Sequence, residues 1–154
     1  MSKVEEKLAS MGHTIPDSPA PVANYLPAMR SGNLVFLSGV APKGGDGTTI
    51  TGKLGSDRSV EEGYEAAQRC ALNLLANLKK TIGDLDKVTQ IVKLLGMVNS
   101  APDFADHPKV INGASDLFVE AFGDKGRHAR SAVGMGALPM NISVEIEAIV
   151  EVAD

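Results

Sequence analysis

The chain has 154 residues, a formal net charge of −4, 44% hydrophobic residues and 22% charged residues. This length and composition predict one globular domain and exclude a disordered or fibrous chain. The acidic charge and an aromatic content of 4% argue against a nucleic-acid-binding surface. No apolar run reaches the roughly 18 residues of a membrane helix, and residues 1–10 lack the apolar core of a secretory signal, so the expected compartment is the cytoplasm.

The first third of the chain predicts a short helix, an extended segment, a strand and a loop. Residues 3–11 favour a helix, and the proline-rich residues 13–27 favour an extended lead-in. The sequence NLVFLSGV at residues 33–40 is typical of a strand that is apolar on both faces. Residues 43–57 contain five glycines and predict a loop that holds at most a short strand at 48–51.

The longest predicted helix spans residues 59–82. Ser59 and Glu62 have the spacing of a capping box at its start, and Gly83 is a suitable residue to end it. Cys70 lies beside the apolar stripe, which indicates a small buried side chain rather than a nucleophile. The residues of the stripe recur at spacings of three and four: Val60, Tyr64, Ala67, Ala71, Leu74, Leu78 and Ile82.

The second half predicts a strand over 88–98, a helix over 108–122, and strands over 129–137 and 143–152. The last strand alternates strictly, with Val144 and Ile146 on one face and Glu145 on the other. The predicted fold class is α+β, with two helices on one face of a sheet. We expect the opposite face to carry Arg130 and the glutamates, and such a half-polar face suggests burial against other subunits.

Several sequence features do not indicate a binding or catalytic site. The segment from Gly47 to Lys53 is similar to the sequence pattern of a phosphate-binding loop. However, Leu54 stands at the position where that pattern needs a Ser or Thr to hold magnesium, so we interpret the segment as a flexible hairpin loop. The histidines lack metal-ligand spacing and are interpreted as solvated loop residues, and no metal or cofactor site is predicted. They are His13, His107 and His128.

Arg130 is the strongest candidate for chemistry, because it begins an otherwise small and apolar strand. Ala132, Gly134 and Gly136 would leave room for a ligand beside its guanidinium, whose planar fork can bind a carboxylate through two hydrogen bonds. Glu145 is the first carboxylate of the strand expected beside it, and could hold a water or transfer a proton. The alternative is that Arg130 and Glu145 form an interface salt bridge.

Two segments together resemble the RidA/YjgF family, also called the endoribonuclease L-PSP family. One is GNLVFLSG at residues 32–39, and the other combines Arg130-Ser-Ala-Val, Leu138-Pro and Val144-Glu-Ile-Glu-Ala. The order of elements between them also matches, so the resemblance covers about residues 20–152. Residues 1–19 are therefore interpreted as an N-terminal extension, and residues 20–154 as a single domain.

The resemblance implies a chorismate-mutase-like α+β fold: a mixed sheet with two helices on one face. It implies a homotrimer with a central barrel and clefts between subunits. It also implies hydrolysis of reactive enamines and imines, such as 2-aminoacrylate, to a 2-oxo acid and ammonia. This activity is that of an enamine/imine deaminase, and it uses no metal or organic cofactor.

The resemblance also assigns site residues by position. Arg130 matches the family's carboxylate-binding arginine, and Glu145 matches its water-handling glutamate. Ala132 stands where the family's deaminases often have cysteine, and Ala23-Asn24 replaces the usual Gly-Pro before a matched tyrosine. The predicted site comprises the catalytic residues Arg130, Glu145, Tyr25 and Ser38 and the substrate-binding residues Arg130, Ala132 and Gly39.

Two other functions stay open at this point. The first is an endoribonuclease or translation inhibitor, an activity attributed to some family members, which requires salt-sensitive RNA binding. The second is a non-catalytic trimer that binds a small ligand or acts like a chaperone and keeps the arginine cleft. Release of ammonia or of a 2-oxo acid distinguishes the deaminase from both.

Overall fold

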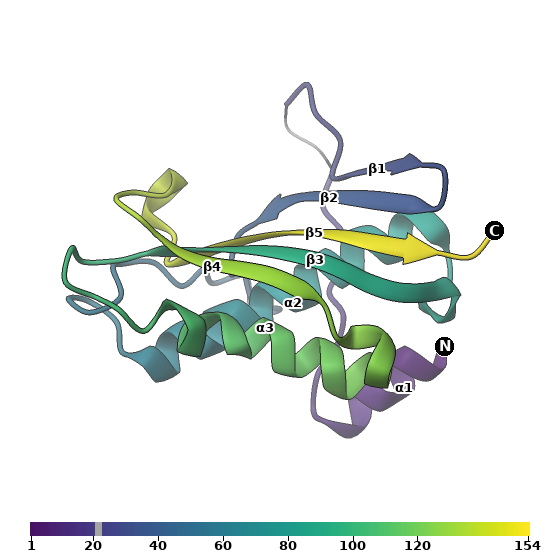
Figure 1. Cartoon of the computed structure of the whole chain (residues 1–154), viewed down its shortest axis with the longest axis horizontal. Coiled ribbons are helices and arrows are strands. Elements are labelled where there is room, and N and C mark those ends of the chain that lie inside the picture. The colour runs from purple at the N-terminus through teal and green to yellow at the C-terminus, as the bar shows by residue number, and fades with distance from the viewer. Residues whose placement is uncertain (21–22) are drawn as a thin grey trace.

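The last strand of the chain lies in the middle of a five-stranded mixed sheet with the order β1-β2-β5-β3-β4 (Figure 1). The computed structural model describes residues 1–20 and 23–154. β3 and β4 run parallel, whereas the other neighbouring strands are antiparallel. The strands are β1 (Ala28–Ser31), β2 (Leu34–Val40), β3 (Val88–Asn99), β4 (Ala129–Met135) and β5 (Val144–Val152).

Helices cover one face of this sheet (Figure 1). The predicted helix over 59–82 is confirmed with its capping box, because the Ser59 side chain accepts from the Glu62 N–H and the Glu62 side chain accepts from the Ser59 N–H. A further helix, α1, packs against α3 and the turn η1. The elements are α1 (Lys3–Ser10), α2 (Val60–Ile82) and α3 (His107–Phe122), with 3₁₀ turns η1 (Leu85–Lys87), η2 (Gly123–Gly126) and η3 (Pro139–Asn141).

The hydrophobic core lies between the covered face of the sheet and α2 and α3. The predicted alternation of β5 is confirmed, since Val144, Ile146, Ala148, Val150 and Val152 are buried. The other face of the sheet, called here the open face, carries the glutamates of β5 together with apolar side chains. Phe36 is 42% exposed and Val133 is 38% exposed.

Two predictions about the last strands were wrong. β5 is not the neighbour of β4, because β3 lies between them. Arg130 pairs in register with the buried Leu94, so its side chain lies on the helix-covered face and not with the glutamates. Alternation along a strand decides which residues share a face, but packing of distant segments decides which strands pair and which face the helices cover.

Smaller differences concern the first half of the chain. The strand β1 was not predicted, and the segment expected to hold a short strand forms only isolated bridges, Lys43 with Thr49 and Thr51 with Ile142. Residues 13–20 and 23–27 of the expected lead-in contain no helix or strand, and residues 21 and 22 lie outside the described residues. Within the described chain, no helix has the length and apolar character needed to cross a bilayer.

The two long helices pack closely at Gly113, where a Cβ atom would lie 2.1 Å from the Tyr64 carbonyl oxygen. We expect Gly113→Ala to lower the free energy of unfolding by about 2 kcal/mol, because the helix backbones must separate. Gly45→Ala is the matched control, since a Cβ atom there meets nothing within 4 Å. Urea unfolding measures both variants, and equal stabilities would contradict this packing.

Candidate active site

Glu145 lies on the open face, where β5 meets the end of β2. A Cβ atom at Gly39 would lie 2.2 Å from Glu145 Oε2, so glycine at this position makes room for the carboxylate. Ser38 Oγ donates to the Leu26 carbonyl oxygen at 2.7 Å, which holds the segment containing Tyr25 against the same end of β2. The Tyr25 side chain is 57% exposed. The structure thus gathers the chain segments of four predicted site residues at one corner.

The environment of Glu145 favours proton exchange. Desolvation raises the pKa of this carboxyl group, and the negative charge of Glu147 raises the pKa further. Glu147 follows on the same face of β5 and is exposed. A carboxyl group with a raised pKa can donate and accept a proton nearer neutral pH, which suits general acid–base chemistry.

Arg130 lies at the start of the edge strand β4, and its guanidinium points to α3. Nη1 donates to Ser115 Oγ at 3.0 Å, and Nη2 donates to the Pro108 carbonyl oxygen at 3.2 Å. Both acceptors are neutral. Among residues 1–20 and 23–154, no carboxylate forms a salt bridge with this arginine. The remaining N–H donors of the guanidinium are therefore available to an anion.

Arg130 and Glu145 do not meet within one chain, and the alternative of an interface salt bridge between two copies of the chain stays a prediction. They lie on opposite faces of the sheet, on strands separated by β3. Ala132 shares the face of Arg130. A single chain therefore assembles the corner around Glu145 but leaves Arg130 and Ala132 apart from it. Because β4 is an edge strand, Arg130 lies at the rim of the sheet.

Cys70 is a small core residue, as predicted. It is fully buried, and its Sγ lies 3.5 Å from the Val40 carbonyl oxygen and 3.7 Å from that of Val144. Burial raises the pKa of this thiol far above its usual value, and the nearby charge of Glu145 adds to the effect. A thiol that stays protonated is a poor nucleophile.

The interpretation of the histidines as solvated loop residues was wrong for two of them. His107 begins α3, and its Nε2 lies 3.2 Å from Ser100 Oγ. His128 is partly buried, and its Nε2 lies 2.8 Å from Ser115 Oγ. The sequence contains a signal for His128: it precedes Arg130 by two residues at the start of a strand, which places both on one face. Ser115 was missed, although it is a polar residue beside an apolar helix stripe.

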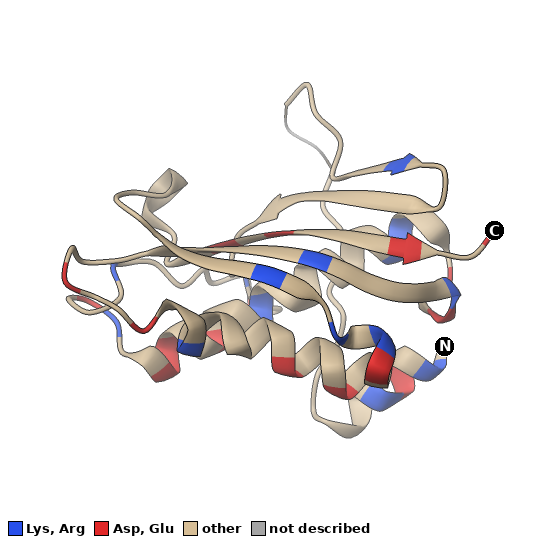
Figure 2. Cartoon of the chain, in the orientation of Figure 1, with Lys and Arg blue, Asp and Glu red and all other residues tan. Residues whose placement is uncertain are grey.

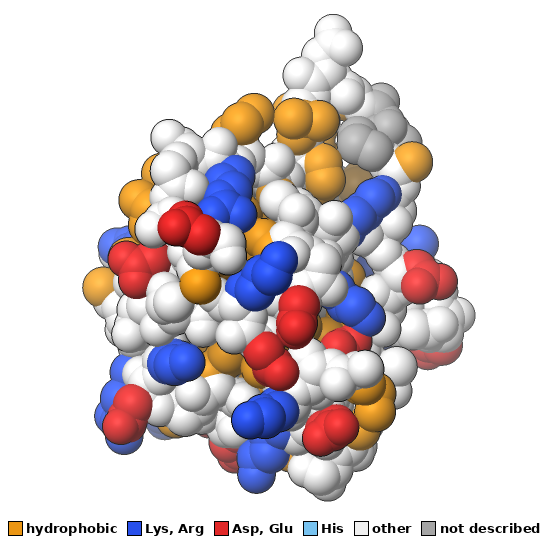
Figure 3. Space-filling view, turned by 90° about the vertical axis from the view of Figure 1, so that its right-hand side faces the viewer, with side chains coloured by type: hydrophobic (Ala, Val, Ile, Leu, Met, Phe, Trp, Pro, Cys, Tyr) orange, Lys and Arg blue, Asp and Glu red, His pale blue; other side chains and the backbone are white. Residues whose placement is uncertain are grey.

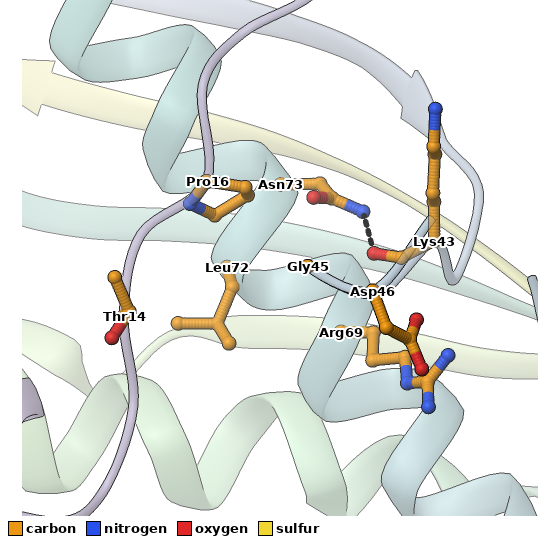
Figure 4. Close-up of a pocket in the computed structure, with 9 residues that line it drawn as sticks. Thr14, Pro16, Lys43, Gly45, Asp46, Arg69, Leu72 and Asn73 are labelled. Carbon is orange, nitrogen blue, oxygen red and sulfur yellow. Dashed lines mark hydrogen bonds between the residues drawn. The ribbon is translucent and has the colours of Figure 1, made fainter. Parts of the chain in front are cut away.

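A hollow of about 330 Å³ lies away from these residues, between α2, the 43–46 loop and the N-terminal segment (Figure 4). It contains Arg69, whose Nη2 lies 3.3 Å from Glu65 Oε1 and whose Nη1 donates to Thr48. The charge of Asp46 also acts on this arginine. Because acidic groups of the chain already balance its charge, this hollow is a weaker anion site than Arg130.

Comparison with known proteins identifies the family of the chain. Residues 5–152 match the family described as "YjgF/chorismate mutase-like, putative endoribonuclease". The chain is 43% identical over 150 residues to Protein TCP17 of Trypanosoma cruzi, covering 97% of this chain and 94% of that protein. A solved structure of an Agrobacterium tumefaciens protein of unknown function is 45% identical, with a TM-score of 0.92, covering 98% of this chain and 93% of that one.

A more distant relative carries an enzyme name. The chain is 29% identical over 136 residues to a protein of Dermatophagoides farinae named 2-iminobutanoate/2-iminopropanoate deaminase. The match covers 88% of this chain and 91% of that protein. These comparisons confirm the family and the fold class that the two sequence segments indicated.

Glu145→Gln is expected to increase the free energy of unfolding at pH 7. The folded chain holds the Glu145 proton more tightly than the unfolded chain does, so wild-type stability falls as the pH rises from the unfolded pKa through the folded pKa. The amide cannot ionise, so the advantage of the variant should shrink as the pH is lowered through the same interval. Urea unfolding at several pH values measures this difference.

The control is a pH titration of Glu145, in which NMR monitors the chemical shift of its side-chain carboxyl carbon. Its pKa should exceed 4.5 in the wild type and fall in Glu147→Gln, because one neighbouring negative charge is removed. A Glu145 pKa at or below 4.5 would rule out the desolvated carboxyl group.

Proposed function

Because the chain belongs to the YjgF/chorismate mutase-like family, we propose that it hydrolyses reactive enamines and imines that carry a carboxylate, such as 2-aminoacrylate, to 2-oxo acids and ammonia. The observation that carries this proposal is Arg130: a partly buried guanidinium, fixed by two neutral acceptors, with no acidic partner in the described chain. Such a group suits a substrate carboxylate. The name of the Dermatophagoides farinae relative supports the same substrate class.

The proposed reaction needs an anchor, a proton and a water. Arg130 holds the carboxylate, and an enamine first becomes an imine by gaining a proton on carbon and losing one from nitrogen. Water then adds to the imine carbon and forms a C–O bond, while Glu145 accepts a proton from the water and passes it to nitrogen. The hydroxyl proton of this carbinolamine then moves to nitrogen while the C–N bond breaks, so ammonia leaves and the C=O bond of the 2-oxo acid forms. No electrons are exchanged, so the mechanism uses no redox cofactor.

We propose that the complete site forms between copies of the chain in a homotrimer. The support is geometric: one protomer holds Arg130 and Glu145 on opposite faces, so a cleft that contains both needs Arg130 of one protomer and Glu145 of the next. The partly exposed Phe36 and Val133 give the open face apolar surface to bury. Light scattering should give about 48 kDa, three times the 16.1 kDa of one chain, and a 16 kDa particle would contradict the proposal.

Endoribonuclease activity, which the family description mentions, has less support in this chain. Its net charge is −4. Charges of both signs are distributed over the helices and loops (Figure 2), and they alternate on the face shown in Figure 3. An RNA-binding surface would concentrate positive charge, and its affinity would fall steeply with salt.

The proposed location, the cytoplasm, stays a prediction.

Arg130→Ala should lower kcat/KM for imino acids by at least about 10², because a two-bond contact between charged groups is lost. Arg130→Lys should recover only part of this loss, since an ammonium offers a point donor instead of a fork. The assay measures ammonia and 2-oxo acid released from imines generated in solution by an amino-acid dehydratase.

Arg69→Ala is the matched control, because it removes an arginine that Glu65 already neutralises. It should retain wild-type turnover. An esterified substrate should show little difference between the wild type and Arg130→Ala. Wild-type turnover in Arg130→Ala would exclude Arg130 as the anchor.

A further inference from the structure

Behind Arg130, on the side of α3, three side chains form a continuous hydrogen-bonded chain. Arg130 Nη1 lies 3.0 Å from Ser115 Oγ, and Ser115 Oγ lies 2.8 Å from His128 Nε2. His128 Nδ1 lies 2.6 Å from the Gly126 carbonyl oxygen. The four groups come from β4, α3, the residue before β4 and the turn η2, so they connect the start of the edge strand to the helix that covers it.

The chemistry of the four groups fixes the direction of each hydrogen bond. A carbonyl oxygen can only accept, so Nδ1 of His128 carries the proton that is donated to Gly126. In a neutral imidazole Nε2 is then an acceptor, and the Ser115 hydroxyl donates to it. The Ser115 oxygen is left to accept from Arg130. A neutral His128 therefore orients the hydroxyl so that its lone pairs face the guanidinium.

The surroundings of His128 favour its neutral form. Desolvation lowers the pKa of the imidazole, and the charge of Arg130 lowers it further, against the opposing effect of the bond to Gly126. From α3, Phe118 presents its ring edge-to-face at a centroid distance of 6.3 Å. The adjacent Arg127 lies 3.6 Å from Asp124 of η2, so its charge is partly balanced.

We propose that His128 and Ser115 are positioning residues, which hold the guanidinium of Arg130 in the orientation that receives the substrate carboxylate. This inference rests on the proposed function, in which Arg130 is the carboxylate anchor. The Pro108 carbonyl oxygen holds Nη2, and Ser115 holds Nη1. With both ends fixed, the guanidinium cannot rotate freely, and its unused N–H donors present a preset fork to the ligand.

Substitution of Ser115 tests most directly the positioning of Arg130 by Ser115 and His128, called here the relay. Ser115→Ala removes the hydroxyl and leaves Nη1 without this acceptor, so the guanidinium gains rotational freedom. Ser115→Thr keeps the hydroxyl and is the rescuing control. His128→Phe keeps an aromatic ring beside Phe118 but removes the acceptor that orients the hydroxyl.

The probe is 2-oxobutanoate, a stable product of the proposed reaction. We expect Ser115→Ala and His128→Phe to weaken its binding and raise KM by about tenfold, the effect of losing one hydrogen bond, while kcat changes little. Ser115→Thr should bind within about threefold of the wild type. Calorimetry gives the affinities, and urea unfolding identifies any variant that binds weakly because it is destabilised.

A second readout follows the imidazole itself by NMR, with His128→Gln used to assign its signals. Arg130→Ala should raise the pKa of His128, because a nearby positive charge is removed. Bound 2-oxobutanoate should raise the same pKa in the wild type by balancing that charge, and should not raise it in Arg130→Ala.

The outcomes separate the relay from the function on which it depends. If the wild type binds 2-oxobutanoate through Arg130 but Ser115→Ala binds it equally well, the relay is wrong and the proposed function stands. If the wild type neither binds the probe nor hydrolyses imines, the proposed function fails, and the relay fails with it. Tight binding by Ser115→Ala together with weak binding by Ser115→Thr would also overturn the relay.

Discussion

Coverage of a single face of the sheet by α2 and α3 decides where every polar side chain of the candidate site can lie. Strand side chains alternate between faces, so each residue is assigned either to the helices or to the open face. Arg130 falls under α3, where neutral acceptors hold it, and Glu145 falls on the open face, beside a glycine that makes room for it. The separation of the two groups within one chain follows from this arrangement, and the proposed site between copies of the chain rests on it.

Both groups are kept in states that reduce the stability of the fold. A partly buried arginine that no carboxylate of the described residues pairs with has lost hydration without gaining a counter-charge, and a desolvated carboxyl group opposes its own ionisation. A fold selected for stability alone would pair these charges or replace them with apolar residues. Arg69 shows such pairing, because its Nη2 forms a salt bridge with Glu65 Oε1 at 3.3 Å. The contrast between these two arginines is the main support for the proposal that Arg130 is the carboxylate anchor.

Local patterns predicted the elements well, because the forces that form them act over a few residues. The capping box of Ser59 and Glu62, the stripe of α2 and the alternation of β5 are all present. The order of the strands was not predictable in this way. Neighbours in sequence were expected to be neighbours in the sheet, but β5 pairs with β2 and β3, so Glu145 is not beside Arg130.

The supporting residues of the site were harder to predict than its charged members. Arg130 and Glu145 are conspicuous because a charge on a mostly apolar strand needs an explanation. Ser115 and His128 are ordinary residues until α3 packs on β4 and brings them within 2.8 Å of each other. Their role depends on a contact between separate elements, which no spacing along the chain specifies.

The most direct measurement of the central claim is a crystal structure of the protein with 2-oxobutanoate bound. The account predicts a carboxylate oxygen about 2.7–2.9 Å from the nitrogens of Arg130, with Ser115 still bonded to the guanidinium. It also predicts that Glu145 of a neighbouring copy faces the reacting carbon. The account would be contradicted by a structure in which an acidic side chain of a neighbouring copy forms a salt bridge with Arg130 while the ligand binds elsewhere.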